Sequence, residues 1–387
     1  MTRSRRTTLF VVLAAALAAV AAGAANARTS AWTQTTVATG LDSPRALTFS
    51  PNGDLLVAEG GHGGDVCQPM GPLGDHCIGL TSRITSVDTG TGALTPLVSG
   101  LFSSSLGQEG ITGVDGVAES GGKLYATMTG FHQMFDGWTC ANQPADCAAV
   151  LAAAKTEAGQ LEHVSNGGTV QPVADVGGHD FDLTVADPTL SNPMEGPNAN
   201  PYGLVALPMG VWVADAGANL LDWVPNDGSI DVSSRIAKNA AGGFPNDGVP
   251  TCVAVMRGNL YAADLSGRLW ERLGSFEPTP VTLAGVHHFT GCVSDGLDHL
   301  YLVDMWSTPG PPIPAGPQSA AGTGAVLEYD RRTGATTTLA SGLDFPNGIA
   351  LAKDGSLYVS VGSTCTATGT PFPYCAKGGS IVKLVAP

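Results

Sequence analysis

The chain has 387 residues and a formal net charge of −15 at pH 7, because 18 Lys and Arg stand against 33 Asp and Glu. So acidic a surface repels nucleic acid and anionic membranes, and we expect neither as a partner. Charged residues make up only 13% of the chain, glycine occurs 52 times, and apolar stripes at helical period are nearly absent. This composition favours an all-β fold of short strands joined by tight turns.

Residues 1–27 have the pattern of a secretory signal peptide. Three arginines near the N-terminus precede an apolar run over residues 9–22, and Ala-Asn-Ala at 25–27 forms a small-x-small cleavage signal. The run is too short to span a bilayer, and no later stretch reaches the roughly 18 apolar residues of a transmembrane helix. Thr8 stands where a twin-arginine signal needs a bulky apolar residue, which favours the Sec route. We therefore expect an extracellular protein without a membrane anchor.

One block of sequence recurs six times. It reads as an apolar strand, a tight turn, and a strand of apolar-aromatic-apolar pattern, which is the signature of a β-hairpin. The six copies are Ser43–Glu59, Val114–Met128, Asn200–Asp215, Val249–Asp264, Phe289–Asp304 and Phe345–Val361. A third strand follows each copy, at Ser82–Val87, Gly159–Val164, Asn219–Val224, Gly267–Arg272, Gly324–Tyr329 and Gly379–Leu384. A fourth strand follows the earlier repeats, for example at Leu94–Val98 and Thr336–Ala340, so the repeats predict a six-bladed β-propeller of four antiparallel strands per blade.

The last repeat has no room for a fourth strand, because the chain ends at Pro387. The segment Thr35–Leu41 (TTVATGL) closely resembles the fourth strand of the fifth repeat, Thr336–Leu343 (TTTLASGL). We therefore predict that the N-terminal strand completes the C-terminal blade, which closes the ring and removes a sheet edge. After a short segment at 28–34, residues 35–387 then form a single domain.

The insertions all fall at one kind of position. Those at Gly60–Thr81, Thr129–Ala158, Met305–Thr323 and Gly362–Gly378 follow second strands, and the crossover at Gly177–Ala199 opens on the same side. Neutral drift would scatter insertions over both faces of the propeller. We call this side the looped face and expect long loops without secondary structure that carry the function.

Eight cysteines in an exported chain predict disulfides. Three pairs lie within single insertions, and local pairing is the economical solution for them. The remaining two cysteines occupy equivalent first-strand positions in neighbouring blades, where a bridge is sterically possible. The predicted pairs are Cys67–Cys77, Cys140–Cys147 and Cys365–Cys375, while Cys252 and Cys292 could either form a bridge or stay unpaired.

Polar residues at the starts of first strands and the ends of second strands are the candidates for chemistry, because both positions surround the channel on the looped face. The candidate binding residues are Glu59, Asp115, Asn200, Tyr202, Asp215, Asp264, His288, Asp304 and Asn347. Oxygen ligands of this kind could hold Ca²⁺, with Glu59, Asp115 and Asp264 as ligands. The repeated aspartates Asp215, Asp264 and Asp304 have a competing interpretation, in which each bonds backbone groups of its own blade.

No sequence motif in the chain identifies a catalysed reaction. The sequence has no GxSxG elbow, no HExxH helix, no Walker loop and no GxGxxG turn, and its cysteines lack the spacing of a metal site. No catalytic residue is assigned and no cofactor is certain.

Three stretches carry a family resemblance. The runs Gly40–Gly64, Asn200–Asn219 (NPYGLVALPMGVWVADAGAN) and Gly248–Val255 resemble the ScyD/ScyE family of exported bacterial β-propellers, named after genes linked to the pigment scytonemin. More loosely, the blades resemble NHL-repeat, gluconolactonase and strictosidine-synthase-like propellers. The resemblance implies an exported six-bladed propeller, but it supplies no agreed catalytic residues to transfer.

Two functions follow as hypotheses. The favoured one is a secreted monomer that binds a small molecule, a glycan or a protein on its looped face. The alternative is a Ca²⁺-dependent hydrolase or lactonase of the gluconolactonase or strictosidine-synthase-like type. Under the binding hypothesis Glu59→Gln should have little effect, whereas under the hydrolase hypothesis it should abolish metal binding.

Overall fold

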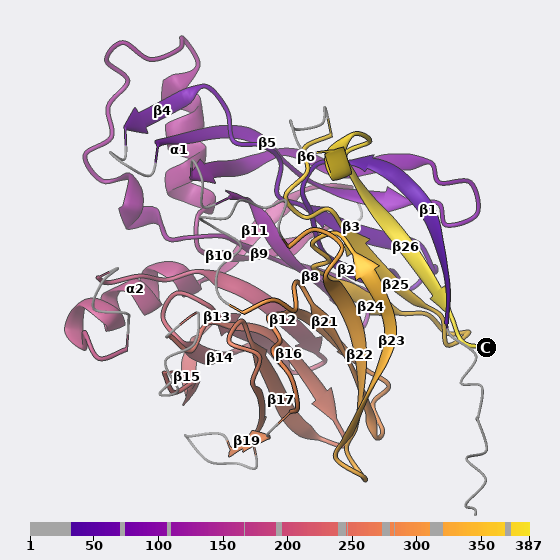
Figure 1. Ribbon diagram of the computed structural model, residues 1–387. Coiled ribbons are helices and arrows are strands. Elements are labelled where there is room, and N and C mark those ends of the chain that lie inside the picture. Colours follow the sequence, from indigo (N-terminus) through magenta and orange to yellow (C-terminus); the bar gives the residue numbers. More distant parts are fainter. Residues whose placement is uncertain are drawn as a thin grey trace, which may run out of the picture. The chain divides into compact units, whose positions relative to one another are not determined.

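The computed structural model describes residues 32–69, 74–106, 110–165, 167–190, 196–238, 245, 247–272, 279–281, 283–309, 320–367 and 373–387 (Figure 1). The predicted signal peptide at residues 1–27, and parts of the insertions of blades 1, 5 and 6 and of the crossover, lie outside these residues.

The described chain forms six antiparallel sheets, one for each blade; five have four strands, and the sheet of blade 1 has two short strands, β4 and β7, beside its four blade strands. Blade 1 contains β2 (Pro44–Phe49), β3 (Leu55–Glu59), β5 (Asp75–Val87) and β6 (Leu94–Leu106), and blade 2 contains β8 (Val114–Ser120), β9 (Lys123–Met128), β10 (Gln160–Val164) and β11 (Val170–Asp175). Blade 3 contains β12 (Pro201–Leu207), β13 (Gly210–Asp215), β14 (Leu220–Pro225) and β15 (Asp231–Arg235), and blade 4 contains β16 (Pro250–Met256), β17 (Asn259–Asp264), β18 (Leu269–Arg272) and β19 (Thr279–Val281). Blade 5 contains β20 (Phe289–Ser294), β21 (His299–Asp304), β22 (Gly324–Asp330) and β23 (Ala335–Leu343), and blade 6 contains β24 (Ile349–Leu351), β25 (Leu357–Val361), β26 (Gly379–Val385) and β1 (Thr33–Leu41). The predicted six-bladed propeller is confirmed.

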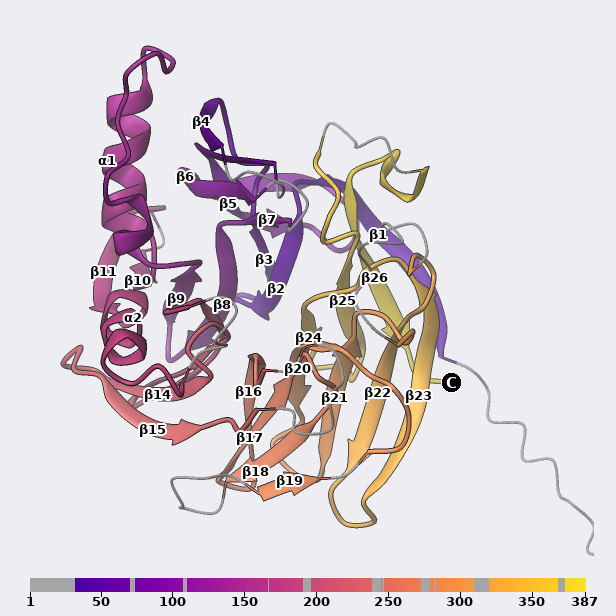
Figure 2. The same cartoon turned by 60° about the vertical axis from the view of Figure 1, so that its left-hand side comes forward.

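The first strands of the blades form a closed ring. Each inner strand contacts that of the next blade, in the order β2, β8, β12, β16, β20, β24 and back to β2. The ring closes as predicted, because β1 pairs antiparallel with β26 from Thr33↔Val385 to Leu41↔Gly379. Both views show the N-terminal strand β1 beside the C-terminal strand β26 (Figure 2).

Apolar side chains fill the spaces between neighbouring blades. Between blades 2 and 3, for example, Tyr125 and Leu161 pack against Val211, Val213 and Val224, and all five are buried. The middle strands have neighbours on both faces, so their apolar runs are continuous rather than alternating, as β3 (LLVAE) shows by being buried throughout. Each fully buried Leu or Val contributes roughly 1.5–3 kcal/mol of transfer free energy.

The insertions are not the structureless loops that we expected. In blade 1 the strands β5 and β6 run beyond the blade and pair with β4 (Val66–Pro69) and β7 (Ile111–Thr112). The blade 2 insertion contains η2 (His132–Phe135) and α1 (Cys147–Glu157), the crossover contains α2 (Val176–Ala186), and blade 6 contains η4 (Pro373–Cys375). The alanine-rich sequence of α1 favours a helix, and its buried residues join Ile78 and Phe102 in one apolar cluster.

No helix within the described ranges is long and apolar enough to cross a membrane.

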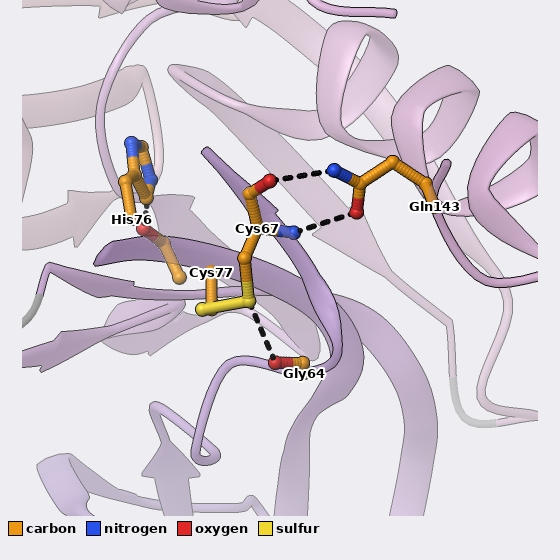
Figure 3. The surroundings of a disulfide bond; sticks show 6 residues. Gly64, Cys67, His76, Cys77 and Gln143 are labelled. Carbon is orange, nitrogen blue, oxygen red and sulfur yellow. Dashed lines mark hydrogen bonds between the residues drawn. A yellow bond between two sulfur atoms is a disulfide. The ribbon is translucent and has the colours of Figure 1, made fainter. Parts of the chain in front are cut away.

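The three predicted disulfides are present, and Cys252 and Cys292, whose bridge the sequence left open, form the fourth. Cys67–Cys77 joins β4 to β5, and Cys252–Cys292 joins the inner strands of blades 4 and 5. Gln143 lies in the insertion of blade 2. Its Oε1 accepts a hydrogen bond from the Cys67 amide (3.1 Å), and its Nε2 donates one to the Cys67 carbonyl (2.7 Å) (Figure 3). This pair of bonds covers the outer edge of β4 and fastens the blade 2 insertion to that of blade 1.

The disulfides should differ in their contributions to stability. Loop-closure entropy predicts that replacing Cys252 and Cys292 by Ser, which opens a loop of 40 residues, lowers the free energy of unfolding by about 4 kcal/mol. Replacing Cys365 and Cys375, which are 10 residues apart, should lower it by about 3 kcal/mol. Urea denaturation of the two double variants measures both values, and the reverse order would contradict this account.

Candidate functional site

A ring of polar side chains surrounds the channel where the inner strands begin. In five blades the pairing of first and second strands shifts register after its first residue pair, so the next residue of the inner strand is left out of the ladder. In blade 6 the equivalent residue, Asn347, lies two residues before β24. We name these residues the channel ring: Arg45, Asp115, Tyr202, Thr251, Thr290 and Asn347.

The channel ring borders a small cavity. Five of its members line a cavity of about 50 Å³, together with the residues that follow them on each inner strand, including Cys252 and Cys292. The sixth member, Arg45, reaches the cavity wall through its contact with Asp115. Binding pockets for drug-sized ligands are roughly 300–1,000 Å³, so this cavity has room only for water or for one polar group of a ligand.

The members of the ring contact one another across blades. The Arg45 Nε atom lies 3.5 Å from Asp115 Oδ1, while its Nη2 donates to the carbonyl of Ile111. Asn347 Nδ2 donates to Tyr202 Oη at 2.6 Å. These contacts bring together three predicted residues, Asp115, Tyr202 and Asn347.

Asp115 stands out within the ring because its carboxylate is paired with Arg45 but accepts no hydrogen bond of normal geometry from the described part of the chain. Its side chain is 0% exposed, and within the described residues neither oxygen has a hydrogen-bond partner; the Arg45 Nε also lacks one. The nearby Thr129 hydroxyl donates to Asn200 Oδ1 instead, at 2.7 Å. Burial raises the pKa of Asp115 to about 6, although Arg45, the Thr129 hydroxyl and the Gly113 amide oppose the rise. A buried carboxyl that titrates near neutral pH beside a cavity is a strong functional candidate.

Glu59, in contrast, is fully engaged in a buried ion pair. Arg83 donates from Nε to Oε1 at 2.8 Å and from Nη2 to Oε2 at 2.9 Å. The hydroxyl of Thr85 and the amide of Asp42 also donate to this carboxylate. Glu59 therefore fastens β3 to β5 and to the entrance of blade 1, which is a structural role.

Asp215 and Asn200 have similar roles in blade 3. Asp215 Oδ1 accepts the amides of Asn200, Gly217 and Ala218, at 2.7–2.9 Å. Asn200 Oδ1 accepts from Thr129 and from the Gly130 amide, so it joins blade 3 to blade 2. Neither residue lines the channel cavity.

Asp264 holds the turn after its strand. Its Oδ2 accepts from Arg268 Nε and Trp270 Nε1, both at 2.8 Å, and its Oδ1 accepts from the Arg268 amide and the Ser266 hydroxyl. These bonds favour the structural interpretation of the repeated aspartates.

Asp304 and His288 are also bound within their own blade. Asp304 accepts from the His288 amide at 2.8 Å and lies 2.8 Å from His287 Nδ1. His288 is 2% exposed, stacks on Trp306 with 4.1 Å between ring centroids, and lies 2.8 Å from the Trp306 carbonyl. His288 does not line the channel cavity.

The three carboxylates predicted as calcium ligands do not form a common site. Across the described residues, no three or more His, Cys, Asp or Glu side chains are placed so that they could hold a metal ion. Arginines already pair with Glu59 and Asp264, whereas Ca²⁺ needs six to eight free oxygen ligands.

The site list from the sequence omits three ring members, Arg45, Thr251 and Thr290. Each of the three residues directly follows the Pro or Phe at which its inner strand starts. An alignment of the six repeats would have shown this shared position.

Comparison with known proteins finds short likenesses in sequence and longer ones in fold. The strictosidine synthase family matches residues 318–368. Protein STRICTOSIDINE SYNTHASE-LIKE 3 of Arabidopsis thaliana is 49% identical over 41 residues, which are 11% of this chain and 10% of that protein. A gluconolactonase of Xanthomonas campestris has a TM-score of 0.52 at 10% identity, covering 93% of this chain and 92% of that one. A luciferin-regenerating enzyme has a TM-score of 0.51 at 8% identity, covering 92% and 95%.

At such identities a likeness between structures shows the fold alone. The chain therefore has a propeller fold related to gluconolactonase and strictosidine-synthase-like proteins.

The structure changes the prediction for Glu59→Gln. Because the variant leaves the half-buried Arg83 without its carboxylate, we now expect it to lower the free energy of unfolding by about 3 kcal/mol. Urea denaturation measures this value, with Asp65→Asn as a control at an exposed acidic residue in the same blade. A Glu59→Gln variant as stable as the control would contradict the structural role.

Proposed function

We propose that this chain is an exported binding propeller of the ScyD/ScyE type, which holds the polar end of a small molecule or glycan at the channel ring. One observation carries the proposal: Asp115 is fully buried, and no hydrogen-bond donor in the described part of the chain satisfies its oxygens. Leaving a buried acceptor unsatisfied costs roughly 1–3 kcal/mol, and more for a charged group. A ligand that donates to Asp115 recovers this free energy on binding.

The chemistry of the ring suggests a hydroxyl-bearing ligand. The ring combines one carboxylate, one guanidinium, one phenol, one amide and two hydroxyls; the hydroxyls of Thr251 and Thr290 donate to backbone carbonyls and so present only acceptor capacity to a ligand, as the carboxylate does. The cavity of about 50 Å³ admits one such group, while the rest of the ligand lies toward the looped face. The insertions leave the blades at this end of the channel, since second-strand ends such as Glu59 and Met128 pair with first-strand starts.

Export is supported by the cysteines. Four disulfides are typical of an oxidising, extracellular environment. The signal-peptide pattern of residues 1–27 supports secretion by the Sec route. We further propose a monomer without a membrane anchor and with no nucleic-acid partner, in line with the acidic charge.

The calcium-dependent lactonase is the alternative, and its proposed ligands weigh against it. Glu59 accepts two hydrogen bonds from Arg83, and Asp264 accepts from Arg268 and Trp270. Removing these partners to admit a cation would leave buried arginine charges unpaired.

Binding is tested by calorimetric titration of the purified protein with D-glucose, D-glucosamine and a set of short glycans. We expect at least one probe to bind, and Asp115→Asn to weaken its binding at least tenfold, or about 1.4 kcal/mol. Asp231→Asn, at an exposed acid of blade 3, is the matched control and should bind as the wild type does. Equal binding by wild type and Asp115→Asn, or no binding of any probe, would contradict the proposal. Turnover of D-glucono-1,5-lactone that EDTA abolishes would establish the alternative instead.

The affinity should also depend on pH. A ligand hydroxyl donates to the ionised form of Asp115, whose pKa is about 6 in the free protein. Binding should therefore be strongest above pH 7 and should weaken as the pH falls through 6 and the carboxylate takes up a proton. Repeating the titrations between pH 5 and pH 8 measures this dependence. An affinity that rises on acidification would show that Asp115 acts as a donor and would contradict its role as acceptor.

A further inference from the structure

Three aspartates from three different elements meet beneath the crossover helix of blade 3. Asp180 is on α2, Asp215 ends β13, and Asp222 lies in the middle of β14. Each of the three is 0% exposed. The carboxyls of Asp215 and Asp222 are the ionisable groups that act most strongly on the Asp180 carboxyl. We call these residues the aspartate cluster.

Most oxygens of the cluster have no hydrogen-bond donor. One oxygen of Asp180, one of Asp215 and both of Asp222 are without a partner within the described ranges. The satisfied oxygens are Asp215 Oδ1, which receives three backbone amides, and Asp180 Oδ1, which lies 2.8 Å from His179 Nδ1. Ionised carboxylates accept hydrogen bonds but cannot donate them, so three in contact cannot satisfy one another.

Positive charge is scarce around the cluster. The basic side chain among the main electrostatic influences on Asp222 is His179, which is 36% exposed. Other ionisable groups on α2 and on the elements packed against it interact with different partners. His132 of η2 forms an ion pair with Asp175, and Asp182 accepts a hydrogen bond from Gln133. The pKa of Glu162 of β10 is set mainly by its own burial and by Glu157. On β10, His163 lies against the ring of Tyr125.

We propose that the aspartate cluster is a buried proton-binding site that docks α2 onto blade 3 when it is protonated. A protonated carboxyl gains a donor, so a shared proton converts a contact between like charges into a hydrogen bond. Asp180 is the member on α2, and it therefore links the helix to the two strands beneath.

The docked helix also positions the insertion of blade 2. Gln133 Nε2 donates to the Gly178 carbonyl at 3.3 Å, and Phe131 stacks on Phe181 with 4.4 Å between ring centroids. Loosening α2 would therefore loosen the neighbouring part of the looped face.

The direction of the pH effect follows from the pKa shifts. Burial raises the pKa of Asp215 to about 6 and raises the pKa values of Asp180 and Asp222 well above their usual range. Between pH 4 and these values the folded cluster holds more protons than the unfolded chain. Its contribution to stability is therefore greatest in acid and declines as the pH rises through 6 and above.

Hydrogen exchange measured by mass spectrometry on the full exported chain tests the proposal. After correction for intrinsic exchange rates, protection of the α2 amides should fall at least tenfold between pH 5 and pH 8 in the wild type. In Asp222→Asn, which cannot ionise and can donate, protection should change less than threefold over this range. Asp231→Asn, an exposed acid of the same blade, should behave as the wild type does.

A second variant and a direct measurement cover the case in which Asp222→Asn does not fold. Asp180→Asn should flatten the pH dependence in the same way, and infrared spectroscopy of the wild type at pH 7 should show the band of a protonated carboxyl. Protection that is independent of pH in the wild type, or equally dependent in the Asn variants, would overturn the proposal. So would a rise in melting temperature on adding CaCl₂ that Asp222→Asn abolishes, because the cluster would then be a cation site.

Discussion

The pairing of β1 with β26 is the interaction on which the rest of the architecture depends. It completes blade 6 and thereby allows β24 to meet β2, the last contact of the inner ring. At that seam the Ser360 hydroxyl donates to the Arg45 carbonyl at 2.7 Å, and Gly348 approaches the same carbonyl so closely that a Cβ would clash with it. Closure therefore fixes the backbone of Arg45, whose side chain must reach Asp115 in the next blade. The candidate site exists only in the closed ring.

The buried carboxylates divide into two groups according to their neighbours. Glu59 and Asp264 each face an arginine on the adjacent strand or turn, and their oxygens are occupied. Asp115 and Asp222 retain unsatisfied oxygens although both are fully buried. Since burial alone does not distinguish the groups, the count of hydrogen-bond donors is the criterion that separates structural acids from candidates for binding.

Repetition explains which features the sequence predicts well. Six copies of one hairpin pattern determine the blades, their order and the place of the missing strand, and pairing within insertions follows from short separations. The partner of Glu59 could not be foreseen, because Arg83 meets it across β3 and β5 in a register that the sequence does not state. Asp222 could have been noticed in the sequence, because an acidic residue inside the strand LLDWVP interrupts an apolar pattern. Its partners could not, because Asp180 and Asp215 come from a helix and a separate strand. Composition likewise suggested loops where the alanine-rich α1 forms a helix.

Asp115 and Asp222 show how similar chemistry can lead to different roles. Asp115 borders a cavity and lies 3.5 Å from Arg45, so an incoming group can approach a carboxylate whose charge is partly balanced. The neighbours of Asp222 are two further carboxylates, and protonation of one carboxyl group reduces the repulsion among them. Arg45 opposes the rise in the pKa of Asp115 and so favours its ionised form, whereas burial and the neighbouring carboxylates both raise the pKa values of Asp180 and Asp222. The local charge balance, rather than the residue type, thus decides whether a buried aspartate offers a site to a ligand or holds the fold together.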